Sequence, residues 1–252
     1  MKKIIVANWK CNPASLREAR RMFLALKAGV RSNKAEVVIC PPFVYLTEAA
    51  KIFKGGKIKL GSQDCFWAEN GPHTGEVSPL MLKSIGVRYV ILGHSERRAM
   101  GESRETVVKK IKAALKNNLT PIVCLGETAE QRNNKETFQV LERQVKEILG
   151  GLAPARIKKI IIVYEPIWAI STTANSRGCS SDDALTAILF LRKLLAKMIG
   201  SKAGQGLSVL YGGSVGGGNI KEYSQNEAIG GLLVGGASLD VKEFLKISQS
   251  NV

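Results

Sequence analysis

Cysteine and histidine are scarce in this sequence. Its 252 residues include five cysteines and two histidines, and no two cysteines form a C-x-x-C pair. Metal sites built from these residues need several of them at short, regular spacings. We therefore predict free thiols and no metal ion. The cysteines are Cys11, Cys40, Cys65, Cys124 and Cys179.

Long hydrophobic runs are also absent. The strongest apolar stretch, residues 160–163 with its flanks, is far shorter than the roughly 18 to 20 residues that cross a membrane as a helix. The chain begins with basic residues, as signal peptides do, but the apolar run at residues 4–7 is too short for one. We therefore expect a cytoplasmic protein that does not enter a membrane.

Acidic and aromatic residues are few beside the basic ones. Lysine and arginine number 37 against 21 aspartates and glutamates, which gives a net charge of +16, and aromatic residues make up 6%. Nucleic-acid-binding proteins concentrate their basic residues and interleave them with aromatics, whereas here the basic residues are scattered. We therefore expect no nucleic-acid partner. Surface solvation and long-range attraction of an anionic substrate explain the charge better.

A short apolar run, rich in β-branched residues, recurs eight times along the chain. Hydrophobic residues make up 45% and charged residues 23%, an ordinary globular composition. The runs are KIIVAN (3–8), AEVVIC (35–40), KIKLGS (57–62), RYVILG (88–93), TPIVCL (120–125), KIIIVYE (159–165), LSVLY (207–211) and IGGLLVG (229–235).

The segments between these runs have helical spacing. Asn12 and Pro13 are predicted as the cap and first turn of a helix, because apolar residues then recur at helical intervals up to residue 30. Three further segments show the same apolar spacing with charged residues opposite. They cover residues 102–116, 128–149 and 181–199.

This alternation of strands and helices predicts a parallel sheet. Strands buried on both faces read as continuous apolar runs, and parallel neighbours need right-handed crossovers. Eight such units in about 250 residues match a closed barrel. An open doubly wound sheet is the alternative, but the G-x-G-x-x-G fingerprint after the first run is missing. We therefore predict an α/β fold, a single (β/α)8 barrel domain over residues 1–252.

Chemically active residues follow several of the predicted strands. The first run ends in Asn8, and Lys10 comes soon after. His94 follows the fourth run, and the sixth run ends in Glu165. Each residue alone has an ordinary structural explanation, such as a helix cap or a solvated charge. Because active sites in this barrel are built at the carboxyl ends of the strands, their joint position predicts one shared site.

Six motifs occur in order along the chain: NWKCN, GHSERR, CLGE, YEPIWAI, YGGSV and GGASL. Together they resemble the triosephosphate isomerase family, from near residue 4 to near residue 240. The resemblance implies a TIM barrel enzyme of glycolysis and gluconeogenesis. It would interconvert dihydroxyacetone phosphate and D-glyceraldehyde 3-phosphate through an enediolate, without a cofactor or metal.

The resemblance also assigns the proton transfer. Glu165 corresponds to the family's base, since one carboxylate can take a proton from one carbon and return it to the next. His94 corresponds to the electrophile, which hydrogen-bonds the substrate oxygens as a neutral ring. The family is itself a known example of this tuning by a helix N-terminus, and a short helix is expected to start at Ser95.

Three further residues match the family's site around the same reaction. Lys10 would supply a fixed positive charge for the phosphate and the developing oxyanion. Asn8 would donate a hydrogen bond beside it, and Glu96 would pair with Lys10. The phosphate itself needs backbone N–H donors on turns where the main chain approaches closely. The matching positions are Ser171, Ser214, Gly235 and Gly236.

The segment after Glu165 departs from the family's lid pattern. Ser171 and Thr173 replace two glycines, and Ala174 replaces a lysine. If either glycine position needs a positive φ, the substitution strains one form of the lid by roughly 1 to 3 kcal/mol. We expect an active enzyme with altered lid closure.

The segment at residues 64–78 is long for a connection between a strand and a helix. In the family, this loop carries a threonine into a pocket of a second subunit. Thr74 and Gly75 match that pattern, while His73 stands where an apolar aromatic residue is common. The resemblance therefore implies a homodimer formed through this loop.

Two other functions remain open from the sequence. The changed lid allows an isomerase of another small phosphorylated sugar. The chain could also be a phosphate-binding barrel without turnover, although retention of a ligand alone does not require the base at Glu165.

Overall fold

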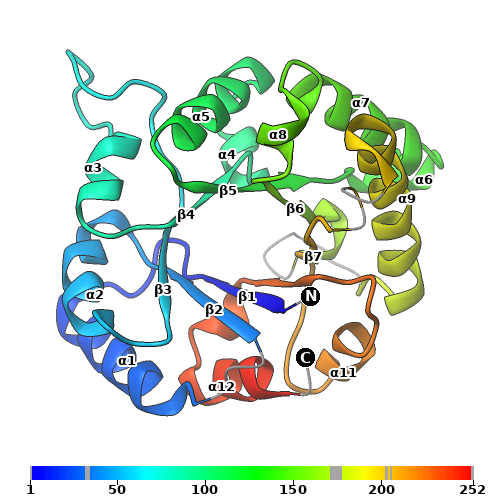
Figure 1. Cartoon of the computed structure of the whole chain (residues 1–252). Coiled ribbons are helices and arrows are strands. Elements are labelled where there is room, and N and C mark those ends of the chain that lie inside the picture. Colours follow the sequence, from blue (N-terminus) through cyan, green and yellow to red (C-terminus); the bar gives the residue numbers. More distant parts are fainter. Residues whose placement is uncertain (1, 32–34, 171–177, 202–203, 205, 251–252) are drawn as a thin grey trace.

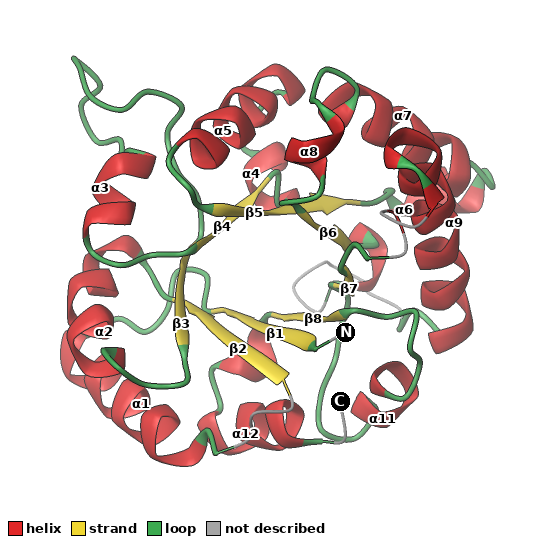
Figure 2. Cartoon of the chain, viewed as in Figure 1, coloured by secondary structure: helices red, strands yellow, loops and turns green. Residues whose placement is uncertain are grey.

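The eight strands form one closed parallel barrel in the order β1 to β8 in this computed structural model. The structure describes residues 2–31, 35–170, 178–201, 204 and 206–250. Helices surround the barrel in a single outer ring (Figures 1 and 2). The predicted α/β barrel is confirmed.

The strands lie within the eight apolar runs, and several are shorter than predicted. The structure places β3, β6, β7 and β8 two residues later than the runs begin. The strands are β1 (Lys3–Asn8), β2 (Ala35–Cys40), β3 (Lys59–Ser62), β4 (Tyr89–Leu92), β5 (Thr120–Leu125), β6 (Ile161–Tyr164), β7 (Val209–Tyr211) and β8 (Gly231–Val234).

The helices connect successive strands on the outside of the barrel, and short 3-10 turns follow some strand ends. The helices are α1 (Leu16–Gly29), α2 (Leu46–Phe53), α3 (Pro79–Ser84), α4 (Ser95–Ala99), α5 (Arg104–Lys116), α6 (Ala129–Asn133), α7 (Thr137–Leu149), α8 (Pro154–Ile157), α9 (Ser181–Ile199), α11 (Ile220–Ser224) and α12 (Val241–Gln249). The 3-10 turns are η1 (Phe43–Tyr45), η2 (Ile167–Ala169) and η3 (Gly236–Ser238).

Two helix predictions are wrong in detail. The first helix begins at Leu16, because Ser15 caps it by accepting the amide of Glu18. Asn12 instead donates its side-chain amide to the carbonyl of Trp9. The segment 128–149 forms two helices, α6 and α7, since Lys135 between them takes a φ of +60°.

The core has two layers. One fills the barrel with small and branched side chains, and the other lies between the strands and the helices. Barrel closure depends on Gly231 of β8, which pairs with Ile4 of β1. A Cβ at Gly231 would lie 1.9 Å from the carbonyl oxygen of Ile4, so only glycine allows the strands to approach this closely.

No helix in the described part of the chain is long and apolar enough to cross a membrane.

Candidate active site

The carboxyl ends of four strands meet at one small cavity. Its volume is about 20 Å³, and it opens where β1, β6, β7 and β8 end and beside the turn after β4. The predicted residues Asn8, Lys10, His94, Glu165 and Gly235 all line it, together with Ile170, Gly212, Gly213 and Leu233. The barrel therefore brings together residues that lie far apart in the sequence.

Glu165 and His94 are in direct contact. Oε1 of Glu165 lies 2.8 Å from Nε2 of His94, and its Oε2 accepts the amide hydrogen of Ser95 at 3.0 Å. The Glu165 side chain is almost fully buried. Its backbone is fixed by a hydrogen bond from its own N–H to the carbonyl of Leu125. The carboxylate is thus held by defined donors at the end of β6.

The hydrogen bonds of His94 indicate its protonation state. Its Nδ1 accepts the amide hydrogen of Glu96 at 3.3 Å, which makes His94 the N-cap of α4. A nitrogen that accepts a hydrogen bond carries no proton, so the proton of a neutral ring lies on Nε2. Nε2 then donates to Glu165. The short helix expected after His94 is present as α4.

The surroundings of Glu165 lower its pKa. Burial acts to raise the pKa, but the contact with His94, the positive charge of Arg98 and the Ser95 amide together outweigh it. Arg98 lowers the pKa of Glu165 through its charge, since its Nη2 lies 3.8 Å from Oε2 of Glu165. The carboxylate is therefore held in its ionised form, which is the form a base requires.

Lys10 is held in an uncommon backbone conformation beside the cavity. Its φ is +54°, in the left-handed region that costs a side-chain-bearing residue energy. Gln63 donates a hydrogen bond from Nε2 to the Lys10 carbonyl at 2.8 Å, and a second one to Cys40. The ammonium group lies 2.7 Å from Oε1 of Glu96, which is the pairing expected for Glu96.

Asn8 is buried at the end of β1 and faces the same cavity. Its Oδ1 accepts the amide hydrogen of Lys10 at 3.1 Å. Because the carbonyl end of the side chain is used in this way, the NH2 end is the one that remains to donate. This orientation suits a hydrogen-bond donor beside Lys10.

The predicted phosphate-binding residues differ in whether they line the cavity. Gly235 lies beside the Lys10 side chain and lines the cavity, and Gly236, which is exposed, begins the turn η3. Ser214 is exposed and does not line the cavity, and its amide donates to the carbonyl of Ala169 at 3.0 Å. Ser171 and the other changed lid positions lie outside the described residues.

The segment that follows Glu165 is anchored by a buried carboxylate. Glu127 accepts hydrogen bonds on Oε1 from the Tyr164 hydroxyl at 3.0 Å and the Trp168 indole at 2.9 Å. The guanidinium of Arg132 lies 5.1 Å from the centre of the Trp168 ring. These contacts fix the chain on both sides of Glu165.

A buried charge cluster lies beside the helix that His94 caps. Lys110 of α5 is 3% exposed and donates to both oxygens of Asp64, at 2.8 and 2.7 Å, and to Glu102. Arg97 of α4 lies 3.1 Å from Asp64 as well. The cluster therefore joins α4, which His94 caps, to α5 and to the start of the loop at 64–78.

Several residues of the site were missed by sequence analysis. Gln63 donates its side-chain amide to a backbone carbonyl, and Ser95 donates its backbone amide to Glu165. Neither residue type indicates such a role in the sequence. Gly212 and Gly213 lay within the YGGSV motif but were not singled out. In the part of the chain that the structure describes, no group of three or more histidine, cysteine, aspartate or glutamate residues is placed to hold a metal ion.

A second cavity of about 360 Å³ adjoins the site on the side of Lys10 and His94. Phe43, Gln63 and Met100 also line it. This cavity therefore borders Lys10 and His94 from the outside of the site.

Comparisons with known proteins agree with this geometry. A sequence model of the triosephosphate isomerase family matches residues 3–251. The triosephosphate isomerase of Thermoanaerobacter pseudethanolicus is 46% identical over 245 residues, which is 97% of each chain. That of Alkaliphilus oremlandii is 44% identical over 98% of each chain, and that of Dictyoglomus thermophilum is 42% identical over 99% of each. The chain belongs to the triosephosphate isomerase family.

Proposed function

We propose that this chain interconverts dihydroxyacetone phosphate and D-glyceraldehyde 3-phosphate, with Glu165 as the base. The observation that carries the proposal is the 2.8 Å contact between the ionised carboxylate of Glu165 and Nε2 of His94, in a cavity that Lys10 also lines. A base, a neutral hydrogen-bond donor and a fixed cation around one cavity are the groups needed to form an enediolate.

Glu165 moves the proton between two neighbouring carbons. The carboxylate takes the proton from the carbon beside the carbonyl, and the bonding electrons form the carbon–carbon double bond of the enediolate while the carbonyl oxygen becomes negative. Glu165 then returns the proton to the adjacent carbon, while the hydroxyl proton of the first carbon passes to the former carbonyl oxygen and the first carbon becomes the new carbonyl. In this structure its oxygens contact His94 and Ser95, so the carboxylate must turn away from the Ser95 amide to reach the substrate.

His94 and Lys10 stabilise the negative oxygen. Nε2–H of His94 donates to the substrate oxygens, since Nδ1 is already used by the Glu96 amide. Lys10 supplies positive charge without moving a proton, and Asn8 donates beside it. Ile170 and Leu233 are buried and apolar, so they exclude water from the cavity and strengthen these interactions.

The phosphate is proposed to lie over the turns after β7 and β8. Gly235 and Gly236 let the main chain approach it, and Gly235 also lies next to Lys10. The hydroxyl of Ser214 is proposed to contribute, whereas its amide must first leave the Ala169 carbonyl. Ser171 is retained as a proposed ligand on the basis of the sequence alone.

A coupled assay with glyceraldehyde 3-phosphate tests this function. We expect the wild-type chain to convert it, and Glu165→Gln to lower kcat by about 10² to 10⁴-fold, the usual contribution of a positioned acid–base group. Glu130→Gln makes the same chemical change on the surface of α6 and should leave kcat unchanged. No conversion by the wild type would reject the triose substrate, while full activity of Glu165→Gln would reject only its role as base.

The chain is also proposed to act as a homodimer in the cytoplasm. The loop at 64–78 extends away from the barrel in Figure 1 (cyan), and Thr74 at its tip is exposed. The 360 Å³ cavity beside Lys10 is a suitable site for the tip of a partner's loop. Val44 and Met100 are 79% and 70% exposed, as expected for apolar residues that a second subunit covers.

Sedimentation at micromolar concentration tests the dimer. Thr74→Arg places a charge at the loop tip and should produce monomers with reduced isomerase activity. The exposed substitution Thr186→Arg on α9 is a matched control that should remain dimeric. A wild-type chain that sediments as a monomer would contradict the proposal. Cell fractionation checks the location.

A further inference from the structure

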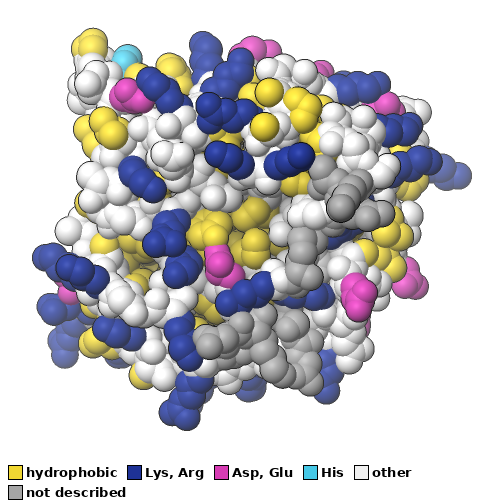
Figure 3. Space-filling view, viewed as in Figure 1, with side chains coloured by type: hydrophobic (Ala, Val, Ile, Leu, Met, Phe, Trp, Pro, Cys, Tyr) yellow, Lys and Arg dark blue, Asp and Glu magenta, His cyan; other side chains and the backbone are white. Residues whose placement is uncertain are grey.

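The end of the barrel opposite the active site is strongly basic. Figure 1 looks onto the end where the strands begin, and Figure 3 shows the same face with lysine and arginine side chains gathered around the barrel mouth and few acidic ones among them. Attraction of a substrate toward Glu165 does not require cations at this end. The net charge of +16 therefore needs a second explanation.

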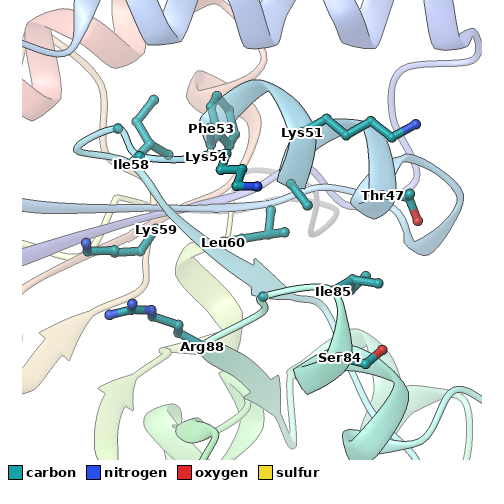
Figure 4. A pocket seen from close by; sticks show the side chains of 14 residues that line it. Thr47, Lys51, Phe53, Lys54, Ile58, Lys59, Leu60, Ser84, Ile85 and Arg88 are labelled. Atoms are coloured by element: carbon teal, nitrogen blue, oxygen red, sulfur yellow. The ribbon is translucent and has the colours of Figure 1, made fainter.

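A cavity of about 760 Å³ lies on this face between α2, β3, α3 and β4. Its floor is apolar, and its polar lining includes Lys51, Lys54, Lys59 and Arg88. Figure 4 shows Lys59 and Arg88 extending in the same direction from neighbouring strands, while Lys51 points away. No aspartate or glutamate is among the described residues that line it.

A second cavity of about 420 Å³ also borders the start of β4. Lys158, Lys159 and Tyr89 line it, again without a carboxylate from the described residues. Arg88 lines the first cavity and the next residue, Tyr89, lines the second, so both cavities border the start of β4. We call the cations along both cavities the basic track. It consists of Lys54, Lys59, Arg88, Lys158 and Lys159.

The cations of the basic track lack acidic partners. No ion pair within 4.0 Å joins any of them to a described residue. Lys54 and Lys158 follow α2 and α8 directly, where a positive charge stabilises the negative end of a helix. Lys59 and Arg88 lie at the beginnings of β3 and β4, where that explanation does not apply. Like charges gathered in this way repel one another unless an anion binds between them.

We propose that the basic track binds a linear chain of phosphates, such as inorganic polyphosphate. Lysine ammonium groups act as point charges for phosphate, and Arg88 adds a guanidinium that can bind two oxygens at once. Cations spread along two cavities that border the same strand start match a ligand with charges repeated along its length. This site is separate from the catalytic cavity and does not depend on the isomerase proposal.

The track is less suited to single-stranded nucleic acid. Such sites add exposed aromatic rings on which the bases stack. Phe53, in the first cavity, is 5% exposed, and Tyr89, in the second, donates its hydroxyl to Glu36. A phosphate chain without bases therefore fits better than an oligonucleotide.

Calorimetric titration of the full chain with short-chain sodium polyphosphate tests the proposal. Lys59→Gln with Arg88→Gln removes two of the cations, and should weaken binding about tenfold near physiological salt. The slope of log K against log salt should become shallower by about 1.4, or 0.7 for each lost contact. Isomerase activity should not change, because neither residue lies near the catalytic cavity.

Two comparisons make the result decisive. Lys112→Gln with Lys242→Gln removes as much positive charge as Lys59→Gln with Arg88→Gln. It leaves the basic track intact, so this control should bind polyphosphate as the wild type does. Lys158→Gln with Lys159→Gln provides a second test should the first pair fail to fold. Equal weakening by the control pair, or equal affinity for an oligothymidylate with the same number of phosphates, would overturn the proposal.

Discussion

Nε2 of His94 lies 2.8 Å from Oε1 of Glu165, so the proposed electrophile and the proposed base are hydrogen-bonded to each other. The contact makes the carboxylate less basic, because a donor stabilises its ionised form. It also fixes the carboxylate near the place where the substrate oxygens would accept the same Nε2–H. A substrate that takes over this donor returns basicity to Glu165 at the moment it is needed.

The first prediction concerns the pKa of Glu165. His94→Gln removes the largest contact that lowers this pKa, while burial, which raises it, remains. The pKa of Glu165 should therefore rise. A depressed pKa gives stability that is present above the ordinary value of 4.5 and lost as the pH falls through the folded-state pKa. In the variant this stabilisation should be smaller, and its loss should be complete at a higher pH.

Carbon-13 NMR of the side-chain carboxyl groups measures this titration, with Glu165→Gln used to assign the signal. The matched control is His73→Gln, which changes the chain's other histidine, exposed on the loop at 64–78. It should leave the Glu165 titration unchanged. An unchanged midpoint in His94→Gln would show that the contact does not set the pKa.

The second prediction concerns the support of Lys10. Gln63→Leu removes the hydrogen bond that holds the Lys10 carbonyl while keeping a side chain of similar size. We expect kcat/KM to fall about fivefold, which corresponds to a hydrogen bond of about 1 kcal/mol. Gln249→Leu removes the same kind of bond, from Nε2 to the Gly29 carbonyl, far from the site. Steady-state kinetics that change equally in both variants would contradict the role of Gln63.

The third prediction concerns the buried charge cluster. Lys110→Met leaves Asp64 and Glu102 without their shared ammonium group. Removing one member of a buried pair costs about 3 to 5 kcal/mol, since the remaining charge stays buried. Urea unfolding should show this loss. Lys109→Met is the control: Lys109 is exposed and lies over the face of Trp67, so its loss should cost about 1 kcal/mol or less. Similar unfolding midpoints for the two variants would contradict the prediction.

The barrel could be predicted from the sequence because burial on both faces makes every strand a continuous apolar run. Strand starts were less predictable. Lys57 and Lys159 belong to the predicted runs but precede β3 and β6, since their charges remain outside the barrel mouth. The break between α6 and α7 was also missed, because Lys135 is an ordinary residue whose positive φ leaves no mark on the sequence.

The candidate site was predictable where a residue's chemistry is distinctive, and not where its backbone contacts matter. Glu165, His94 and Lys10 were singled out by type and position at strand ends, and they line one cavity. Gln63 and Ser95 contribute through a carboxamide and a backbone amide, which many positions could supply. Only the folded arrangement shows which of them reaches the site.

The last prediction concerns Gly126, which follows β5 directly beside the end of β6. A Cβ at this position would lie 1.9 Å from the carbonyl oxygen of Glu165, so Gly126→Ala must displace the backbone that carries the base. A misplacement of about 1 Å costs about 10²-fold in rate, and kcat should fall by that order. Gly151→Ala is the matched control, because a Cβ there has no atom within 4 Å and neither glycine requires a positive φ. If Gly126→Ala retained the kcat of Gly151→Ala, close packing of β5 against β6 would not be what positions Glu165.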